Sequence, residues 1–168
     1  MNKIGIFYSF NGNKTAQVAK NILEKMNGMP IEAINAETLT EKQFLSYNNL
    51  ILGVPTWFDG ELPNYWDEFG PAIEDMDLKG KYIALYGLGD QVNYSENFLD
   101  AVGIMAGLLQ GRGAKIIGHT LTDGYSFEKS QAVKGNKFLG LAIDFENQED
   151  KNEERIKLWV EQLKSEFK

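Results

Sequence analysis

Two aromatic side chains that follow two different strand-like runs carry the strongest chemical signal in this sequence. Trp57 comes shortly after the apolar run 50–52, which breaks at Gly53 and Pro55, and Tyr94 follows the run 82–86. An apolar run that stops at glycine or proline is typical of a buried parallel strand that enters a loop. Aromatic rings in two such loops can stack on the two faces of a flat ligand, which contributes about 0.5–1.5 kcal/mol per face beyond the burial of apolar area.

Gly89 and Asp90 precede Tyr94 in the same loop and suit the edge of such a ligand. Glycine lets the backbone approach closely, and an aspartate can accept a hydrogen bond from a ring N–H. Each aromatic residue also has a simpler interpretation, because Trp57 could close the edge of a sheet and Tyr94 could pack on the helix that follows it. Both loops are expected at the same edge of the sheet as the segment 9–15, which has the composition of an anion site. This convergence favours a bound flat ligand over the two simpler interpretations.

The segment 9–15 has the composition of that anion site. Backbone N–H groups, hydroxyl side chains and the positive end of a helix dipole all suit a phosphate. The segment is not a P-loop, because that pattern needs glycine where Tyr8 and Asn13 stand. A phosphorylated receiver domain is disfavoured because Ser9, Pro55 and Thr56 occupy positions where acidic residues are needed.

The elements that hold these loops alternate along the whole chain. Apolar runs predict strands at 4–8, 31–34, 50–52 and 82–86, and a fifth strand in two pieces at 114–118 and 138–143. Spacings of three and four predict helices at about 16–26, 64–73, 96–109 and 152–167, the third with Ser95 as its N-cap. This alternation predicts an α/β three-layer sandwich with a five-stranded parallel sheet of order 2-1-3-4-5 and helices on both faces.

In such a sheet the ligand lies above the switch point between the first and third strands. The loops 9–15, 56–60 and 87–94 are expected to meet there. The polar segment 120–136 separates the two pieces of the fifth strand. Because no linker or repeat is visible, we expect the whole chain, 1–168, to form a single domain.

The composition excludes several kinds of chemistry. The chain has no cysteine and only one histidine, His119, which stands at a strand end and is expected to be solvated. Metal sites built on thiolates or several histidines are therefore excluded, and we expect neither a metal site nor catalytic residues. The formal net charge of -7 disfavours nucleic acid and favours a basic protein partner. With no leader-like start and no membrane-spanning stretch, we expect a cytoplasmic location.

Four motifs together resemble the long-chain flavodoxins, and the resemblance covers essentially the whole chain. They are residues 56–62 with Trp66, residues 87–98, residues 122–127, and residues 140–144 with Asn147 and Gln148. The segment 120–136 corresponds to the insertion that splits the fifth strand in that class. The resemblance implies a monomeric flavoprotein with non-covalent FMN, which shuttles single electrons at low potential between redox enzymes and has no substrate turnover of its own.

The resemblance also assigns places around the flavin. Trp57 would stack on its inner face and Tyr94 on its outer face, while Asp90 and the backbone near Gly89 would meet the pyrimidine edge. The peptide that joins Phe58 and Asp59 would reorient so that a carbonyl accepts from the flavin N5–H of the semiquinone. The cofactor-binding residues that we expect are Ser9, Phe10, Asn11, Gly12, Asn13, Lys14, Thr15, Pro55, Thr56, Trp57, Phe58, Asp59, Gly60, Gly87, Leu88, Gly89, Asp90, Tyr94, Asn97 and Glu146.

The phosphate segment differs from the family pattern T/S-x-T-G-x-T. If one residue is inserted, the pattern is covered by Ser9, Asn11, Gly12, Asn13 and Thr15, and Lys14 is extra. Asparagine and glycine can adopt the required positive φ angles. The charge of Lys14 can compensate for missing hydroxyl groups. Glu146 stands where the family often has an aspartate near the ribityl chain.

Acidic residues near the expected flavin predict the direction of redox tuning. If Asp59, Glu61, Asp90 and Glu146 lie ~10 Å away in an effective dielectric of ~40, they oppose a second electron by about 3 kcal/mol, or roughly 140 mV. Two other classes stay open. One is an FMN-dependent enzyme of the quinone-reductase type, and the other is a flavodoxin-like binding module without a cofactor, for which only the altered segment 9–15 argues.

Overall fold

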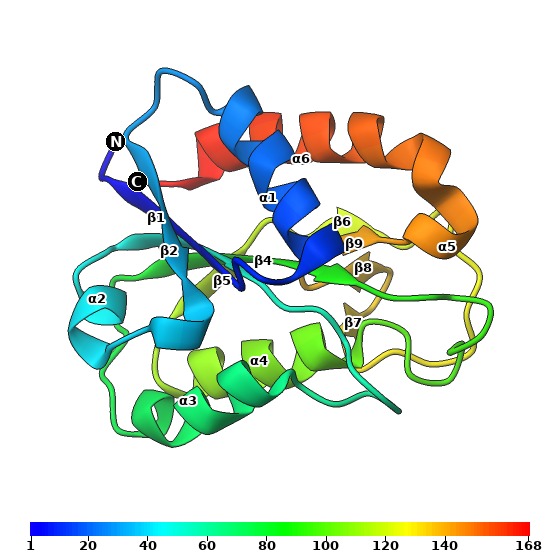
Figure 1. Cartoon of the computed structure of the whole chain (residues 1–168), viewed down its shortest axis with the longest axis horizontal. Coiled ribbons are helices and arrows are strands. Elements are labelled where there is room, and N and C mark those ends of the chain that lie inside the picture. The colour runs from blue at the N-terminus through cyan, green and yellow to red at the C-terminus, as the bar shows by residue number, and fades with distance from the viewer.

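A parallel sheet forms the middle layer of the protein (Figure 1). The structure is a computed structural model that describes residues 1–168. The order β2-β1-β3-β4-β5 confirms the predicted order. These strands are β1 (Ile4–Tyr8), β2 (Ile31–Asn35), β3 (Asn49–Gly53), β4 (Tyr82–Leu88) and β5 (Lys115–Ile117). All the pairings among them are parallel, so the loops that follow β1, β3 and β4 leave from the same edge.

The fifth strand consists of two pieces, as predicted. β5 pairs with the first half of β4, and β9 (Leu141–Ile143) pairs in parallel with its second half. Between them, β6 (Thr120–Leu121), β7 (Val133–Lys134) and β8 (Lys137–Phe138) form a small antiparallel sheet. The second piece begins at Leu141 rather than at the predicted position 138, because Phe138 pairs with Thr120 and Val133 in the small sheet.

Helices cover both faces of the main sheet (Figure 1). α1 (Asn13–Lys25) and α6 (Asn152–Glu166) lie on one face, and α3 (Asn64–Glu74) and α4 (Asp100–Gly111) lie on the other. Each face has its own apolar core, of 18 and 27 buried residues respectively. None of these helices combines the length and apolarity needed to cross a bilayer.

Short elements fill segments in which the sequence shows no hydrophobic periodicity. α2 (Glu41–Leu45) lies in what was predicted to be a polar connection, and Thr40 and Gln43 form a reciprocal capping box at its start. α5 (Phe145–Gln148) follows β9. The 3-10 helix η1 (Ala36–Thr38) precedes α2, and the 3-10 helix η2 (Glu149–Lys151) follows α5. These elements are too short for an apolar face to repeat.

The prediction that Ser95 caps the helix after Tyr94 is wrong. α4 begins at Asp100, because Leu99 has a positive φ of 61° that interrupts helical geometry. The carbonyl of Ser95 instead accepts the N–H groups of Glu128 and Lys129, each at 2.9 Å. The loop between β4 and α4 is therefore tied to the segment inserted into the fifth strand.

Both chain ends lie at the edge of the sheet where the strands begin (Figure 1). The N–H of Asn2 donates to the carbonyl of Lys168 at 2.8 Å. The buried side-chain amide of Asn49, the first residue of β3, donates to the same carbonyl at 2.7 Å and to that of Asn2 at 3.1 Å. The two ends thus close on a central strand of the sheet.

His119 stands at the end of β5, where it was predicted, but it is not solvated. The side chain is half-buried, and its Nε2 is shielded from solvent and has no hydrogen-bond partner. Burial lowers the pKa of His119. The prediction of a solvated histidine fails because the small antiparallel sheet and α6 enclose this strand end.

Candidate functional site

The loops that follow β3 and β4 border an open cavity of about 380 Å³. Trp57, Phe58 and Tyr94 are 37%, 75% and 51% exposed, which is unusual for large apolar side chains on neighbouring loops. The cavity therefore offers aromatic surface to a flat ligand. Its lining residues are Thr56, Trp57, Phe58, Gly89, Asp90, Tyr94, Asn97 and Phe98.

The loop that carries Trp57 is a tight turn. The N–H and carbonyl of Trp57 pair with the carbonyl and N–H of Glu61 at 2.8 and 2.7 Å. Inside this turn Phe58 and Gly60 have positive φ angles of 49° and 101°. The indole packs edge-on against Tyr65, with ring centroids 6.0 Å apart. These contacts fix the indole while leaving part of it open to the cavity.

A second cavity of about 210 Å³ adjoins the first, since Thr56, Gly89, Asp90 and Tyr94 line both. Its further lining residues are Pro55, Leu88 and Glu146. The two cavities together extend from the aromatic pair to the beginning of α5.

The segment 9–15 lies between β1 and α1 and is shaped by its own polar contacts. Ser9 is buried, and its hydroxyl accepts the N–H of Asn11 at 3.2 Å. The amide of Asn11 in turn donates to Glu37 at 2.6 Å. Asn11 is thereby directed to η1. One N–H of this amide is therefore taken by Glu37, and only the other is left for a phosphate.

The beginning of α1 is open to an anion. Gly12 is the N-cap residue and has no side chain to cap the helix, so the first N–H groups have no intrahelical or side-chain partner. Thr15 in the first turn is buried, and its carbonyl accepts the hydroxyl of Tyr86 at 3.0 Å. An uncapped helix beginning with a lysine beside it fits a phosphate group.

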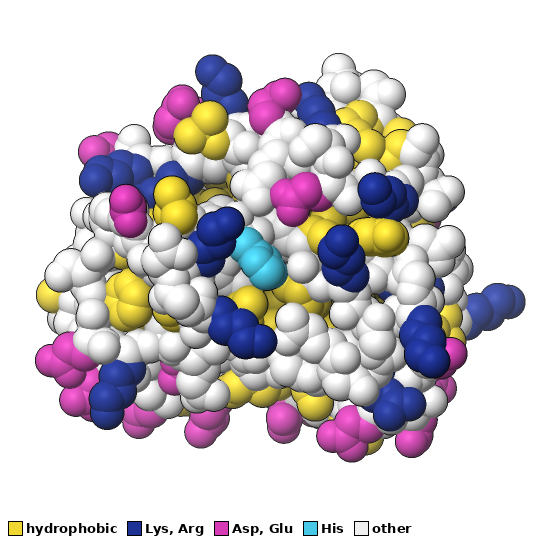
Figure 2. Space-filling model, turned by 180° about the vertical axis from the view of Figure 1, so that it is seen from behind, with side chains coloured by type: hydrophobic (Ala, Val, Ile, Leu, Met, Phe, Trp, Pro, Cys, Tyr) yellow, Lys and Arg dark blue, Asp and Glu magenta, His cyan; other side chains and the backbone are white.

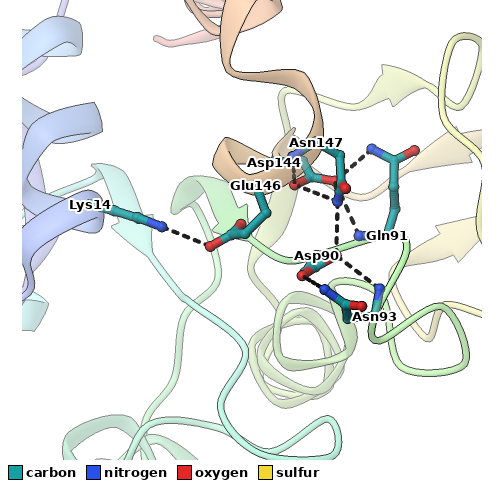
Figure 3. A network of polar contacts seen from close by, with 7 residues as sticks. All are labelled: Lys14, Asp90, Gln91, Asn93, Asp144, Glu146 and Asn147. Atoms are coloured by element: carbon teal, nitrogen blue, oxygen red, sulfur yellow. Dashed lines mark hydrogen bonds and ion pairs between the residues drawn. The ribbon is translucent and has the colours of Figure 1, made fainter.

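Lys14 supplies the only positive side chain of this segment, and it is paired with Glu146 (Figure 3). Its Nζ lies 2.7 Å from Glu146 Oε1 and 5.7 Å from the ring centroid of Phe145. The hydrogen bond to Glu146 raises the pKa of Lys14. The pair connects the segment 9–15 to the wall of the second cavity.

The carboxylate of Asp90 is already occupied by the protein (Figure 3). It accepts the N–H groups of Val92 and Asn93 at 3.1 and 2.9 Å and the side-chain amides of Asn93 and Asn147 at 2.8 Å each. Burial raises the pKa of Asp90, but these hydrogen bonds outweigh it and hold the pKa below its usual range. The N–H of Gly89 donates to the carbonyl of Ile143 at 3.0 Å, so only the other backbone groups beside it are left to meet the edge of a ring.

Sequence reasoning assigned no role to Gln91 and Asp144, which hold the loop after β4 in place. Asp144 is fully buried and accepts the N–H and the side-chain amide of Gln91 at 3.1 and 2.7 Å. Gln91 Oε1 accepts the N–H of Ser126 at 2.7 Å. The signal in the sequence was an aspartate directly after an apolar run and three residues before Asn147, the spacing of an N-cap.

Not every expected binding residue faces a cavity. Gly87 lines neither cavity; a Cβ atom there would come within 2.4 Å of Val102 Cγ2, so its absence allows the close packing of α4 on β4. Phe10 and Asp59 are exposed but line neither cavity, and Gly60 is a buried residue of the turn. The assignment of Gly87 as a binding residue stays a prediction.

Comparisons with known proteins agree with this geometry. A family model described as Flavodoxin matches residues 6–159. The flavodoxin of Nostoc sp. is 41% identical over 165 residues, which cover 98% of this chain and 97% of that protein. The flavodoxin of Enterobacter agglomerans is 44% identical over 173 positions, which cover 98% of each.

Among solved structures, that of Fusobacterium nucleatum flavodoxin bound to flavin mononucleotide matches with a TM-score of 0.95 at 33% identity and covers 100% of both chains. The flavodoxin 2 of Bacillus cereus, in its oxidised form, matches with a TM-score of 0.74 at 27% identity. Because the family model, the full-length relatives and the sheet order all agree, the chain belongs to the flavodoxin family.

Proposed function

We propose that this chain binds FMN without a covalent bond and carries single electrons between redox proteins. Flavodoxins are electron-transfer proteins and not enzymes with a substrate of their own. The observation that carries the proposal is that two exposed aromatic rings, those of Trp57 and Tyr94, line one cavity at the edge of the sheet where β3 and β4 end. The relative from Fusobacterium nucleatum was solved with FMN bound.

The residues around the two cavities fit the parts of FMN. Trp57 on the inner side and Tyr94 on the outer side take the ring system and exclude water from it. The backbone near Gly89 takes the pyrimidine edge, and the peptide between Phe58 and Asp59, within the tight turn, takes the N5 edge. When bound, FMN supplies the one-electron chemistry, and the protein tunes it.

The phosphate is assigned to the uncapped beginning of α1. The N–H groups of its first turn and the positive end of its helix dipole suit an anion. Lys14 adds a full charge. Glu146 competes for this charge, since it already holds the Lys14 ammonium group at 2.7 Å.

Electrostatics make the proposed carrier a low-potential donor. Asp59 and Glu61 are exposed and form no ion pair, so both oppose the addition of negative charge to the ring. Asp90 stays ionised because its pKa is held low by hydrogen bonds. The charge of Glu146 is largely compensated by Lys14, so its share is smaller than the sequence suggested.

The partners, the oligomeric state and the location complete the proposal. The formal net charge of -7 favours redox partners with basic docking surfaces. We further assign a monomer, a single domain over 1–168, membership of the long-chain class and a location in the cytoplasm. The segment between β5 and β9 supports the assignment to the long-chain class.

Titration of the apoprotein with FMN and with riboflavin tests the proposal, with flavin fluorescence as the readout. We expect a yellow protein as purified, tight binding of FMN and much weaker binding of riboflavin, which lacks the phosphate. Equal binding of the two would retain the ring site and remove the phosphate site. Absence of binding of either would overturn the proposal in favour of a module without a cofactor.

A second assay separates the carrier from an enzyme on the same fold. The FMN-loaded protein is mixed with NAD(P)H and a quinone, and absorbance at the nicotinamide band is followed. We expect no consumption until a flavodoxin reductase is added. Rapid consumption by the protein alone would favour the quinone-reductase-type enzyme.

A further inference from the structure

A third cavity, of about 480 Å³, lies where α6 meets the small antiparallel sheet. None of its eleven lining residues lines either cavity of the proposed flavin site. Its volume falls in the range of small-molecule sites, about 300–1,000 Å³. The lining residues are His119, Thr120, Leu121, Asp123, Tyr125, Lys137, Leu141, Arg155, Leu158, Trp159 and Gln162.

The cavity has an apolar body. Leu121 from β6 and Leu158 from α6 are 51% and 60% exposed, although both are fully apolar side chains. Leu141 and Trp159 are buried at the same site. Two exposed leucines that border one hollow form a contact surface for an apolar ligand.

Two of the three charged side chains that line this cavity, Lys137 and Arg155, are cationic. Lys137 and Arg155 take part in none of the four ion pairs of the structure. The guanidinium of Arg155 stacks on Tyr125 at 3.9 Å from the ring centroid and donates one hydrogen bond, to Gln148 at 2.8 Å. Asp123 is the only acidic residue in the lining. The site therefore has cationic N–H donors without an acidic partner, on a protein whose formal net charge is -7.

The surface view agrees with this description. Figure 2 shows the face that holds the one histidine, drawn in cyan, beside apolar side chains and among several Lys and Arg side chains; one acidic side chain lies close above it, and most others lie toward the upper and lower borders. The charges of Glu166, Lys137 and Lys134 all act on this histidine, and that of Glu166 acts most strongly. A local excess of positive charge thus surrounds an apolar hollow.

We propose that this cavity is a second ligand site, which binds a small aromatic carboxylate. The flat body of the ligand contacts Leu121 and Leu158, and its carboxylate pairs with Lys137 and the free donors of Arg155. The stacking of Arg155 on Tyr125 holds the guanidinium plane in place before the ligand arrives, which reduces the entropy lost on binding. A charge-assisted pair beside an apolar surface discriminates anions from neutral analogues.

The test uses the protein as purified, with 2-naphthoate as the probe and 2-naphthalenemethanol as its neutral counterpart. Because the chain has a single histidine, the imidazole resonances of His119 report on this cavity without ambiguity. Isothermal titration calorimetry gives the affinity. This readout does not depend on flavin. A failure of the second-site proposal can therefore be told apart from a failure of the FMN proposal.

We expect saturable shifts of the His119 resonances with 2-naphthoate and at least about tenfold weaker binding of the neutral alcohol. Lys137→Gln should weaken 2-naphthoate binding several-fold, and Leu158→Glu should abolish it. Matched controls are Lys20→Gln on α1 and Leu45→Glu on α2, both at exposed positions outside the cavity, and neither should change the affinity. Circular dichroism verifies that each variant is folded.

Three results would overturn the proposal. They are the absence of saturable shifts up to about 10 mM probe, equal affinity for the acid and the alcohol, and binding that is unaffected by both Lys137→Gln and Leu158→Glu. The last result would place the probe elsewhere, for example in the aromatic cavity between Trp57 and Tyr94.

Discussion

Lys14 Nζ lies 2.7 Å from Glu146 Oε1, so the one cation of the phosphate segment is held by an acid on the wall of the neighbouring cavity. A bound phosphate must share or replace this partner. The affinity for FMN is therefore set by a competition between two anions for one ammonium group. The competition can be shifted from either side.

Replacing Glu146 by Gln is expected to tighten FMN binding, and replacing Lys14 by Met to weaken it. The side chains of Lys14 and Glu146 are 48% and 44% exposed, so solvent screening limits each effect to about 1 kcal/mol, or about fivefold in affinity. Riboflavin binding should not change, because it has no phosphate. Flavin fluorescence titration measures both ligands, and Lys20→Met is the matched control. Equal changes for FMN and riboflavin would contradict the competition.

Phe58 has a positive φ of 49° and is 75% exposed, so its backbone is strained and its side chain contributes little packing. Asparagine tolerates this region better, and Phe58→Asn is expected to raise the free energy of unfolding of the apoprotein by about 0.5–1 kcal/mol. Urea denaturation measures the change. Phe10→Asn, at an exposed position without a positive φ, should not raise the free energy of unfolding. A loss at position 58 would mean that its ring packs more than its exposure implies.

Gly103 and Gly107 lie one turn apart in α4 and form a matched pair. A Cβ at Gly107 meets nothing within 4 Å, whereas one at Gly103 would lie 2.2 Å from the backbone oxygen of Gln131. Gly107→Ala is expected to stabilise the protein by about 1 kcal/mol through helix propensity. Gly103→Ala should destabilise it, because the inserted segment must move. Thermal unfolding measures the stability of both variants. An increase in stability for Gly103→Ala would show that the segment around Gln131 moves aside at little cost.

The hydrogen bonds to Asp90 predict a pH dependence. Its pKa is lower in the folded state than in the unfolded chain, so the stability it contributes is present above the unfolded pKa of about 3.9 and is lost as pH falls through the folded pKa. Asn93→Ala removes the bond from the side-chain amide at 2.8 Å and is expected to raise the pKa of Asp90. Titration of the carboxyl carbon resonance by NMR measures this. An unchanged pKa would assign the shift to Asn147 and the backbone instead.

Neutralising the acids of the turn at 57–61 is expected to raise the potential of the second reduction step. Asp59→Asn with Glu61→Gln removes two charges; at ~10 Å and an effective dielectric of ~40 they contribute about 1.7 kcal/mol, or roughly 70 mV. Spectroelectrochemistry of the FMN-loaded variant measures the potential. Glu24→Gln with Glu41→Gln removes two exposed charges from the opposite edge of the sheet and should change it much less. Equal shifts would indicate an effect of net charge alone.

The sheet and its order could be predicted because buried parallel strands are continuous apolar runs. The split of the fifth strand was visible for the same reason, since a polar segment interrupts two apolar pieces. The prediction failed at Phe138, which was assigned to the fifth strand but pairs with Thr120 in the small antiparallel sheet. Periodicity reveals that a residue is buried, but not in which sheet.

The candidate site could be predicted in outline because its aromatic rings interrupt loops where such residues are rare. The polar network could not, because the partners are distant in the chain: Gln91 meets Asp144, and Lys14 meets Glu146. The start of α4 was missed because Leu99 adopts a positive φ and Ser95 is tied to the inserted segment. The burial of His119 likewise depends on packing against α6. This contact between distant segments leaves no local pattern in the sequence.

The joining of the two chain ends at Asn49 has a practical consequence. Asn2 and Lys168 share a hydrogen bond of 2.8 Å at the edge where the strands begin, whereas the proposed cofactor lies at the edge where they end. A fusion partner or a surface anchor attached at either end would therefore leave the electron-exchanging edge accessible. A short peptide joining the ends would also permit circular permutation, with new termini placed in an exposed loop.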